Sequence, residues 1–283
     1  MASSAAMGVL LALISAIVYG CADFGGGRAT RLSNATTVTI SSQLAGFAVV
    51  LVAAPLIPHG PLSSRMFIAG GLGGVAGGVG IMLLYQALAT GTMSIVSPVT
   101  AVCAAAVPIT AGLLLGERPG VLTLAGLMCA LAAIGLVSLV KGEHDPHAGK
   151  TVLMAIGAGI SFGLFYLALS RSGPKPGMWP LVAARVSSVL LAIIVAVLRR
   201  EPMLVERQAA PLAMGVGALD MAANVLFLYA SHLGLLAITG TIASLYPTST
   251  VVLARWLDHE YLRPIQWVGL AFAAVSLVLI SAT

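Results

Sequence analysis

Two stretches of the chain, far apart but similar, decide its fold: GVLLALISAIVYGCADFGGGR at 8–28 and TVLMAIGAGISFGLFYLALSR at 151–171. They align without a gap at a shift of 143 residues, so that Gly20 falls on Gly163. Both are apolar over a length typical of a membrane helix. The first helix of each half of the chain is therefore expected to cross a membrane, and the halves are expected to be repeats.

The repeat reaches the far end of each half, because the same shift of 143 residues places Glu117 on Glu260. A register kept over such distant stretches indicates a true internal repeat rather than biased composition. The polar stretch KGEHDPHAGK separates the two halves. We therefore expect a first five-helix repeat, a polar linker and a second five-helix repeat, at 1–140, 141–150 and 151–283.

Composition places the protein in a membrane. Hydrophobic residues make up 59% of the 283 residues, charged residues only 8%, and the mean hydropathy is +1.04. A soluble domain carries about 25% charged residues, so much of this surface must face lipid. The net charge of +5 comes from Lys and Arg scattered in short gaps between apolar runs, which is not the pattern of a nucleic-acid-binding protein. The sequence predicts a multi-pass protein of the cell membrane with no nucleic-acid partner.

About ten apolar segments are long enough to cross the membrane as helices, since a crossing takes about 20 residues. Charged loops, prolines and glycines separate them. The predicted fold class is therefore an all-α integral membrane protein, with spans near 6–24, 34–57, 66–89, 94–115, 120–140, 151–171, 177–198, 209–231, 235–256 and 264–281.

Five crossings per half is an odd number, which has a consequence for symmetry. The second half must enter the membrane from the opposite face, so the two repeats are expected to be inverted. Inverted repeats are typical of secondary transporters that expose one central site alternately to either face. The excess of Lys and Arg in the loops after the odd-numbered helices predicts that both termini lie outside the cytoplasm.

One block of the first half carries a family resemblance: YQALATGTMSIVSPVTAVCAAAVPITAGLLLGERPGVLTLAGLMCALAAIGL at 85–136. In the second half, corresponding places are held by Tyr229, Pro247, Glu260 and Gly269. The chain resembles the EamA-type branch of the drug/metabolite transporter superfamily. This resemblance implies ten helices in two repeats and the export or exchange of small metabolites, including amino acids and related amphiphiles.

Two departures from that family pattern are visible. Asp258 and His259 precede Glu260, where a Leu-Gly-Glu run is usual. The first half also has Ser42 at the position that Arg185 holds in the second half.

Two charged residues lie deep inside predicted helices, Arg185 and Asp220. A charge at the centre of a membrane costs at least about 2.5 kcal/mol, so each one calls for a reason. Their helices are antiparallel neighbours in sequence. Counted from the loop that joins the helices, both residues lie roughly 17–20 Å into the membrane at 1.5 Å per residue. They are therefore expected at nearly the same depth.

Two interpretations of this pair remain open. Arg185 and Asp220 could form a fixed ion pair that holds two helices together. Alternatively they line a central cavity, where Arg185 would bind a substrate carboxylate through two parallel hydrogen bonds. Asp220 would then bind an amine or take up a driving proton. Asn224 follows Asp220 at i+4 on the same helix face and could assist it.

Further polar and aromatic residues within the predicted helices are candidates for substrate contact: Tyr19, Tyr85, Tyr229, Tyr246, Gln43 and Gln86. For each of them, packing or a helix–helix hydrogen bond is the simpler role. Asp23 lies at the predicted end of the first helix near Arg28, and we expect it to be solvated at the membrane interface.

Glycines and prolines mark two further features. Gly70, Gly74 and Gly78 share one face of the helix at 66–89, and a second face carries other glycines, a spacing that lets helices pack closely. Pro108 and Pro247 are expected to interrupt the fourth and ninth helices. Glu117 and Glu260 lie at helix ends and are expected to serve as loop or capping groups.

The sequence contains no motif for catalysis, nucleotide binding or metal binding. We therefore expect no enzyme activity, no metal and no cofactor, with transport driven by a proton or substrate gradient. The leading hypothesis is a secondary transporter of a small, amino-acid-like or otherwise polar or amphiphilic metabolite. The alternatives are drug or organic-cation efflux, a lipid-linked sugar flippase and a non-transporting membrane subunit.

The charge distribution yields a first testable prediction, on topology. A cysteine introduced in the loop 141–150 should react with an impermeant thiol reagent only from the cytoplasmic side, because Lys141 and Lys150 favour that side. The measurement is labelling of intact cells against inverted vesicles. Labelling of intact cells would reverse the orientation but leave the helix count unchanged.

Overall fold

The computed structural model describes residues 2–90, 93–138, 148–175, 177–257 and 264–281, and these are almost entirely helical. One short 3-10 turn, η1 (Ala54–Leu56), extends the second helix. The helices are α1 (Ala2–Leu32), α2 (Ala35–Ala53), α3 (Ser64–Thr90), α4 (Met93–Leu114), α5 (Val121–Ser138), α6 (Ala148–Ser170), α7 (Trp179–Arg199), α8 (Ala210–Leu233), α9 (Leu236–Ala243), α10 (Tyr246–Leu257) and α11 (Pro264–Ser281).

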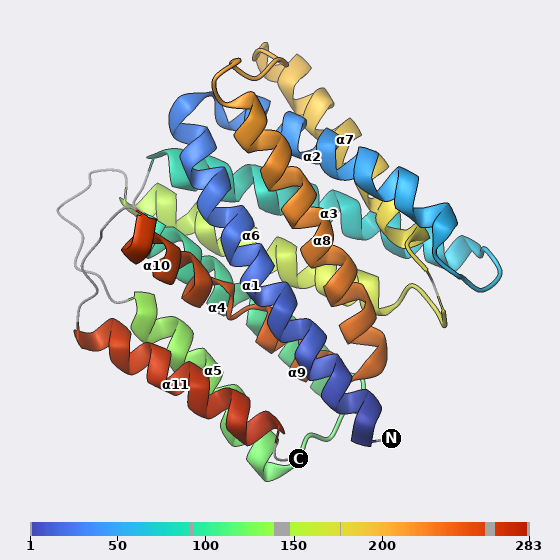
Figure 1. Ribbon diagram of the computed structural model, residues 1–283, viewed down its shortest axis with the longest axis vertical. Coiled ribbons are helices and arrows are strands. Elements are labelled where there is room, and N and C mark those ends of the chain that lie inside the picture. Colours follow the sequence, from blue (N-terminus) through green and yellow to red (C-terminus); the bar gives the residue numbers. More distant parts are fainter. Residues whose placement is uncertain (1, 91–92, 139–147, 176, 258–263, 282–283) are drawn as a thin grey trace.

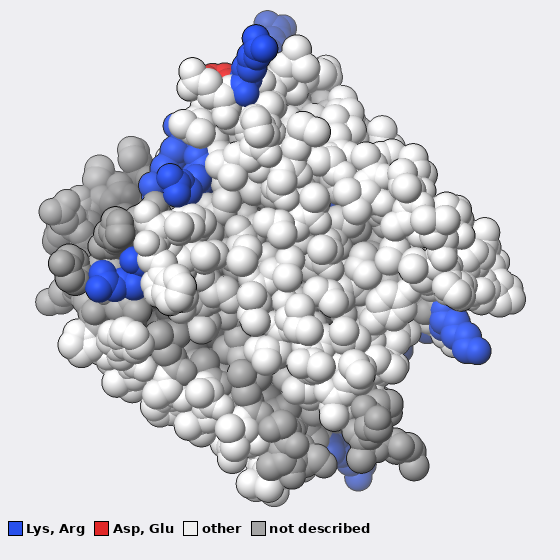
Figure 2. Space-filling model, viewed as in Figure 1, with Lys and Arg blue, Asp and Glu red and all other residues white. Residues whose placement is uncertain are grey.

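About ten membrane crossings are confirmed. Seven spans are long and apolar enough to cross a membrane, and one of them, Leu236–Leu257, combines α9 and α10. Within the described chain, α4, α5 and α11 add three shorter apolar helices. Figure 2 shows why the fold suits lipid: the middle of the visible face carries no charge, and Lys and Arg gather towards its margins.

The two halves are interleaved rather than stacked as separate bodies (Figure 1). Helix α1 packs along α8, and its counterpart α6 packs along α3, the counterpart of α8. Helices α2 and α7 contact each other at one edge, while α5 and α11 form a pair at the opposite edge. Each half thus supplies equivalent helices to every interface, and the central region lies between the halves.

Helix α1 is longer than the sequence predicted, because it continues through Gly25, Gly26 and Gly27 to Leu32 instead of ending near residue 24. The predicted span ends before these glycines because glycines in the sequence are taken as boundaries between apolar segments. A Cβ atom at Gly25 would lie 2.8 Å from Val216 of α8, and one at Gly26 would lie 2.6 Å from the Tyr85 hydroxyl of α3. The glycines therefore allow close approach of neighbouring helices, which outweighs their low helix propensity.

The predicted glycine faces of α3 are confirmed. A Cβ at Gly70 would lie 2.3 Å from the backbone oxygen of Pro180, and one at Gly74 would lie 2.1 Å from that of Ala184. Both contacts join α3 to α7. The second glycine face packs on α6, where a Cβ at Gly80 would lie 2.7 Å from the Phe162 ring. Helix α3 thus packs closely against α7 on one face and against α6 on the other.

The two prolines behave differently. Helix α4 continues through Pro108, whose ring packs where Gly240 of α9 has no side chain. In the second half the helix does stop, at Ser244 and Leu245, and restarts as α10 with Pro247 in its first turn. The predicted interruption is therefore wrong for Pro108 and correct for Pro247. The break sets the position of Tyr246, the first residue of α10.

Glu117 joins the two halves at one end of the molecule. Its carboxylate accepts hydrogen bonds from the backbone N–H groups of Leu236 and Ala237, at 2.9 and 3.0 Å. These are unpaired donors at the start of α9, so the acidic side chain caps the helix and complements its dipole. The capping role expected for Glu117 is confirmed, on a helix of the other half. Its counterpart Glu260 lies outside the described residues.

Close packing between α3 and α7 yields a second prediction. Gly74→Ala should lower the free energy of unfolding by about 1–3 kcal/mol, since the new methyl group meets backbone atoms that cannot rotate away. Gly71→Ala is the control on the same helix, because a Cβ there would lie at an ordinary 3.5 Å from the Ser187 hydroxyl. Thermal unfolding in detergent measures both, and equal melting temperatures would contradict the packing role.

Candidate binding site

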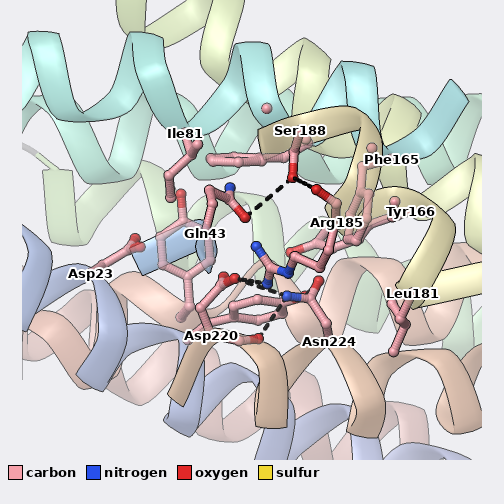
Figure 3. A pocket seen from close by; sticks show the side chains of 17 residues that line it. Asp23, Gln43, Ile81, Phe165, Tyr166, Leu181, Arg185, Ser188, Asp220 and Asn224 are labelled. Atoms are coloured by element: carbon pink, nitrogen blue, oxygen red, sulfur yellow. Dashed lines mark hydrogen bonds and ion pairs between the residues drawn. The ribbon is translucent and has the colours of Figure 1, made fainter. Parts of the chain in front are cut away.

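A narrow cavity lies at the centre of the helix bundle, between residues of both halves (Figure 3). Side chains reach it from α1, α2, α3, α6, α7, α8 and α10. The space open to the centres of water molecules is about 50 Å³, enough for a few waters at roughly 10–15 Å³ each. The cavity is therefore too narrow in this conformation for a solute much larger than water, and such a solute needs the helices to move apart.

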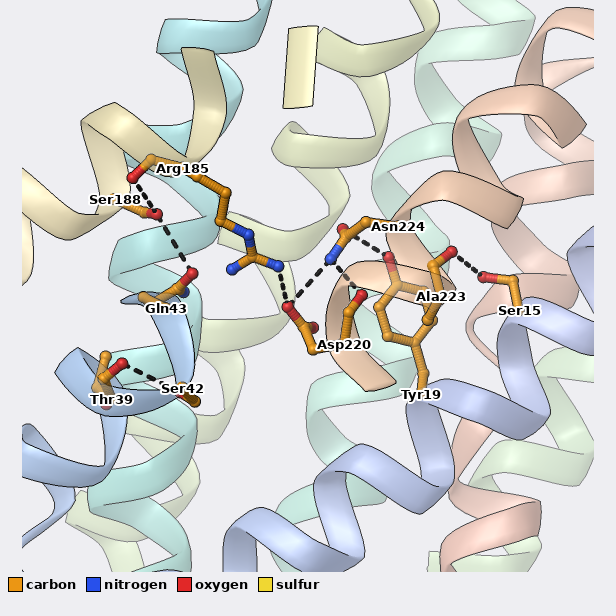
Figure 4. A network of polar contacts seen from close by, with 10 residues as sticks. All are labelled: Ser15, Tyr19, Thr39, Ser42, Gln43, Arg185, Ser188, Asp220, Ala223 and Asn224. Atoms are coloured by element: carbon orange, nitrogen blue, oxygen red, sulfur yellow. Dashed lines mark hydrogen bonds and ion pairs between the residues drawn. The ribbon is translucent and has the colours of Figure 1, made fainter. Parts of the chain in front are cut away.

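An ion pair crosses the cavity. Arg185 of α7 donates from its guanidinium group to a carboxylate oxygen of Asp220 on α8. The same oxygen accepts a hydrogen bond of 3.0 Å from the side-chain amide of Asn224. The amide oxygen of Asn224 in turn accepts from the Tyr19 hydroxyl of α1 at 2.9 Å. A continuous polar network thus links three helices (Figure 4).

Helix α2 completes the surroundings of Arg185, whose exposed fraction is only 6%. The Ser188 hydroxyl lies 3.3 Å from the amide oxygen of Gln43 on α2 and 3.2 Å from the backbone oxygen of Arg185. A Cβ at Gly46 would lie 3.3 Å from the guanidinium carbon, so the lack of a side chain there makes room for the arginine. The guanidinium thus fits beside α2 and pairs with Asp220.

The cavity is symmetric in position but not in chemistry. Under the shift of 143 residues, Asp220 and Asn224 of α8 correspond to Gly77 and Ile81 of α3, and all four line the cavity. Likewise Asp23 and Tyr19 of α1 correspond to Tyr166 and Phe162 of α6. The α1 and α8 side is therefore polar and charged, whereas the α3 and α6 side is apolar and aromatic.

The structure brings most of the predicted site residues together. The cavity is lined by Arg185, Asp220, Asn224, Tyr19, Tyr246 and Gln43. Their contact with a substrate remains a prediction. The two interpretations of Arg185 and Asp220 also merge, because the residues form an ion pair and line the cavity at once.

Three predicted residues lie elsewhere. Tyr85 is fully buried against Gly26, which gives it a packing role between α3 and α1. Gln86 lines a second, wider cavity of about 470 Å³ at the end of the molecule where α1, α3 and α7 finish. Tyr229 is half-buried and is not among the residues that line the central cavity.

The prediction that Asp23 is solvated at the membrane interface is wrong. Asp23 is 8% exposed and lines the central cavity, not the membrane interface. The error follows from ending the first helix near residue 24: with the helix extended to Leu32, Asp23 lies well inside the membrane. A signal was present, because Asp23 is a charge within an apolar run. It also follows the candidate Tyr19 at i+4, which places both on one helix face.

Ser188 and three aromatic residues of α6 also line the cavity and were not predicted from the sequence. Ser188 lies at i+3 from Arg185, a spacing that could have identified it. Phe162, Phe165 and Tyr166 form an aromatic group on α6, and the Tyr166 ring lies 4.3 Å from that of Phe227 and 6.2 Å from that of Tyr19. Their spacing of three and four residues also predicts a shared face.

The cavity combines charged, polar and aromatic side chains. It offers one fixed cation, two carboxylates, amides, hydroxyls and aromatic rings. No group of His, Cys, Asp and Glu able to hold a metal is found in the described part of the chain. The fold and the cavity together define a multi-pass membrane protein with a charged central cavity between two repeats.

Comparison with protein families identifies that class further. The model of the EamA-like transporter family matches the chain twice, at residues 6–139 and 149–282. The chain belongs to this family, whose members are membrane transporters and not enzymes. The resemblance seen in the sequence is thereby confirmed.

A solved structure described as "Crystal structure of protein" shares the fold. It has a TM-score of 0.72 and 16% sequence identity, covering 94% of this chain and 98% of the other. This likeness supports the helix arrangement alone. The search of curated proteins found no match.

The buried ion pair yields a third prediction. Arg185→Leu should lower the free energy of unfolding by about 3–5 kcal/mol, because Asp220 loses its partner in a buried position. Asp220→Leu should cost a similar amount, whereas the double variant should recover most of the loss. Arg199→Leu, at the exposed end of the same helix, is the control and should change little.

Melting temperatures of the four purified variants in detergent provide the measurement. If the loss of stability in the double variant equals the sum of the losses in the two single variants, the two charges do not stabilise each other.

Proposed function

We propose that the protein is a secondary transporter that carries a small polar or amphiphilic metabolite across the cell membrane by alternating access. The main support is the polar network of Arg185, Asp220, Asn224 and Tyr19, buried between two five-helix repeats. Charged groups inside the membrane are costly, and they usually mark a substrate or ion pathway.

The arrangement of the halves supports the alternating mechanism. Because each half crosses the membrane five times, the second half enters from the face opposite to the first. The two halves then pack against each other through equivalent helices, with α1 on α8 and α6 on α3. A rocking motion that opens the cavity to one face can therefore be repeated by the equivalent helices of the other half, which opens the cavity to the other face.

Two local features favour a mobile centre. The break between α9 and α10 lies directly before Tyr246, a residue that lines the cavity. Helices broken near mid-membrane are common at transporter sites, since their freed backbone groups can face a solute. The narrow cavity of about 50 Å³ would then widen when the helices move apart to admit a solute.

The ion pair suits a site that must be stable both empty and loaded. Without a solute, Arg185 and Asp220 neutralise each other. A solute carboxylate can replace Asp220 on the guanidinium, and Asp220 is then free to accept an ammonium group or a proton. Such an exchange couples substrate binding to the relative position of α7 and α8.

The wider cavity supports a route to the site. It lies at one end of the molecule and is lined by Gln86, Lys150, Arg199 and Glu201 among others. Mixed charges at a membrane interface keep such a vestibule hydrated. We assign it as the entrance on the side where α1, α3 and α7 end.

A fourth prediction tests transport separately from folding. Proteoliposomes with the parent protein should show counterflow exchange of at least one solute class among amino acids, sugars, nucleobases and organic cations. The double variant Arg185→Leu with Asp220→Leu should lose this exchange at least tenfold although it remains folded, and Arg207→Leu, at an exposed position outside both cavities, should keep it. An ionophore that collapses the proton gradient should stop accumulation but spare counterflow.

Two outcomes would contradict the proposal. One is a parent protein that neither exchanges nor is thermally stabilised by any of these solutes at several pH values. The other is a double variant that transports like the parent, since the buried charges would then serve stability only.

A further inference from the structure

Asp23 is a buried carboxylate that the network described above leaves without a partner. It is 8% exposed, lines the cavity and points into it from α1 (Figure 3). Among the described residues, no hydrogen bond or ion pair reaches its side chain. A carboxylate at this depth normally has a cation or several donors beside it. The arrangement therefore lacks one positive group next to Asp23.

The packing of α1 on α8 brings Asp23 close to a second acid. The two helices are antiparallel, and contacts from Ser15 to the Ala223 oxygen and from Tyr19 to Asn224 set their register. One turn forward along α1 and one turn back along α8, Asp23 and Asp220 lie at the same level, and both line the cavity. Among the described residues that line the cavity, Arg185 is the one basic side chain, and it is paired with Asp220.

The charges in the cavity therefore do not balance. One guanidinium faces two carboxylates, which leaves one negative charge if both acids are ionised. Asp220 is occupied by Arg185 and Asn224. The carboxylate open to a ligand is thus Asp23, and the ligand group that it calls for carries a positive charge.

The opposite wall indicates what is attached to that charge. Phe162, Phe165 and Tyr166 of α6 line the cavity together with Ile81 of α3 and the backbone of its glycines. Tyr19, one turn from Asp23, adds another ring. Aromatic faces attract ammonium groups and also pack against apolar bodies. A solute with an ammonium head at Asp23 and an apolar body against α6 would match both sides of the cavity.

We propose that Asp23 is the binding residue for the ammonium group of an amphiphilic amine, whose apolar body packs on the aromatic wall of α6. This rests on the proposed transport function and specifies its substrate class. Arg185 and Asp220 stay paired while an amine without a carboxylate is bound, because such a solute has no group that could replace Asp220 on the guanidinium. A substrate with a carboxylate alone fits less well, because it would bring a further negative charge towards Asp23.

The test uses two probes of the same skeleton and opposite charge, phenethylamine and 3-phenylpropionate, on the purified full-length protein. Thermal shift and proteoliposome counterflow should detect binding and exchange of the amine in preference to the acid. Asp23→Asn, which keeps the shape of the side chain, should weaken amine binding roughly ten- to a hundredfold, since a charged hydrogen bond is lost. Glu206→Gln, at an exposed position, is the matched control.

The melting temperature of the ligand-free protein separates a binding role from a structural one. A residue that binds a ligand but pairs with nothing in the protein should not stabilise the empty fold. Asp23→Asn should therefore melt at or above the temperature of the parent. An Asp23→Asn variant that unfolds, or melts lower, would overturn the proposal.

Three other results would also overturn it: equal preference for acid and amine, amine binding that survives Asp23→Asn, and loss of proton-driven accumulation alone in that variant. The last would assign Asp23 to a proton. Exchange of other solutes, such as sugars, with no response to amines would leave the proposed transport function standing and reject only the amine subsite. The absence of exchange for every solute would reject the function itself.

Discussion

The cost of placing a charge inside a membrane governs the centre of this molecule. Arg185 can lie 6% exposed within α7 only because Asp220 on α8 neutralises it and α2 leaves room for its guanidinium at Gly46. Asn224 and Tyr19 then depend on the position of Asp220, and Ser188 and Gln43 on that of Arg185. The ion pair and the hydrogen bonds around it thus connect four helices from both halves at the cavity.

Such a network requires helices that approach one another closely, and small residues make this possible. Gly74 lets α3 contact the backbone of α7, and Gly217 does the same for α8 on α2, where a Cβ would lie 2.0 Å from the Ser42 oxygen. In lipid there is little hydrophobic force between helices, so close packing and interhelical hydrogen bonds supply the stability. The glycines therefore let the helices come close enough for the polar network to form.

The repeat explains the fold, and departures from the repeat explain the site. Equivalent helices occupy equivalent places, yet Asp23 faces a cavity whose other side holds its counterpart Tyr166. Arg185 likewise corresponds to Ser42, which has no charge. A symmetric framework permits both halves to move in the same way, while unequal side chains give the cavity a polar wall and an apolar one.

The sequence by itself determined the membrane environment, the repeat and the number of crossings, because these follow from apolar length, charge content and register, which are all local or periodic. It also placed Arg185 and Asp220 at one depth, since depth along a helix is a matter of counting. Only the tertiary structure decided which residues meet. The glycines at 25–27 favour a helix end in sequence, but in the structure α3 and α8 pack on Gly25 and Gly26 and the helix continues. The burial of Asp23 follows from this continuation and was therefore not predicted. Tyr85 and Tyr246 look alike in sequence, yet one packs against Gly26 and the other lines the cavity. The physical reason is that facing and contact depend on helix rotation, and rotation is set by the packing of helices distant in the chain.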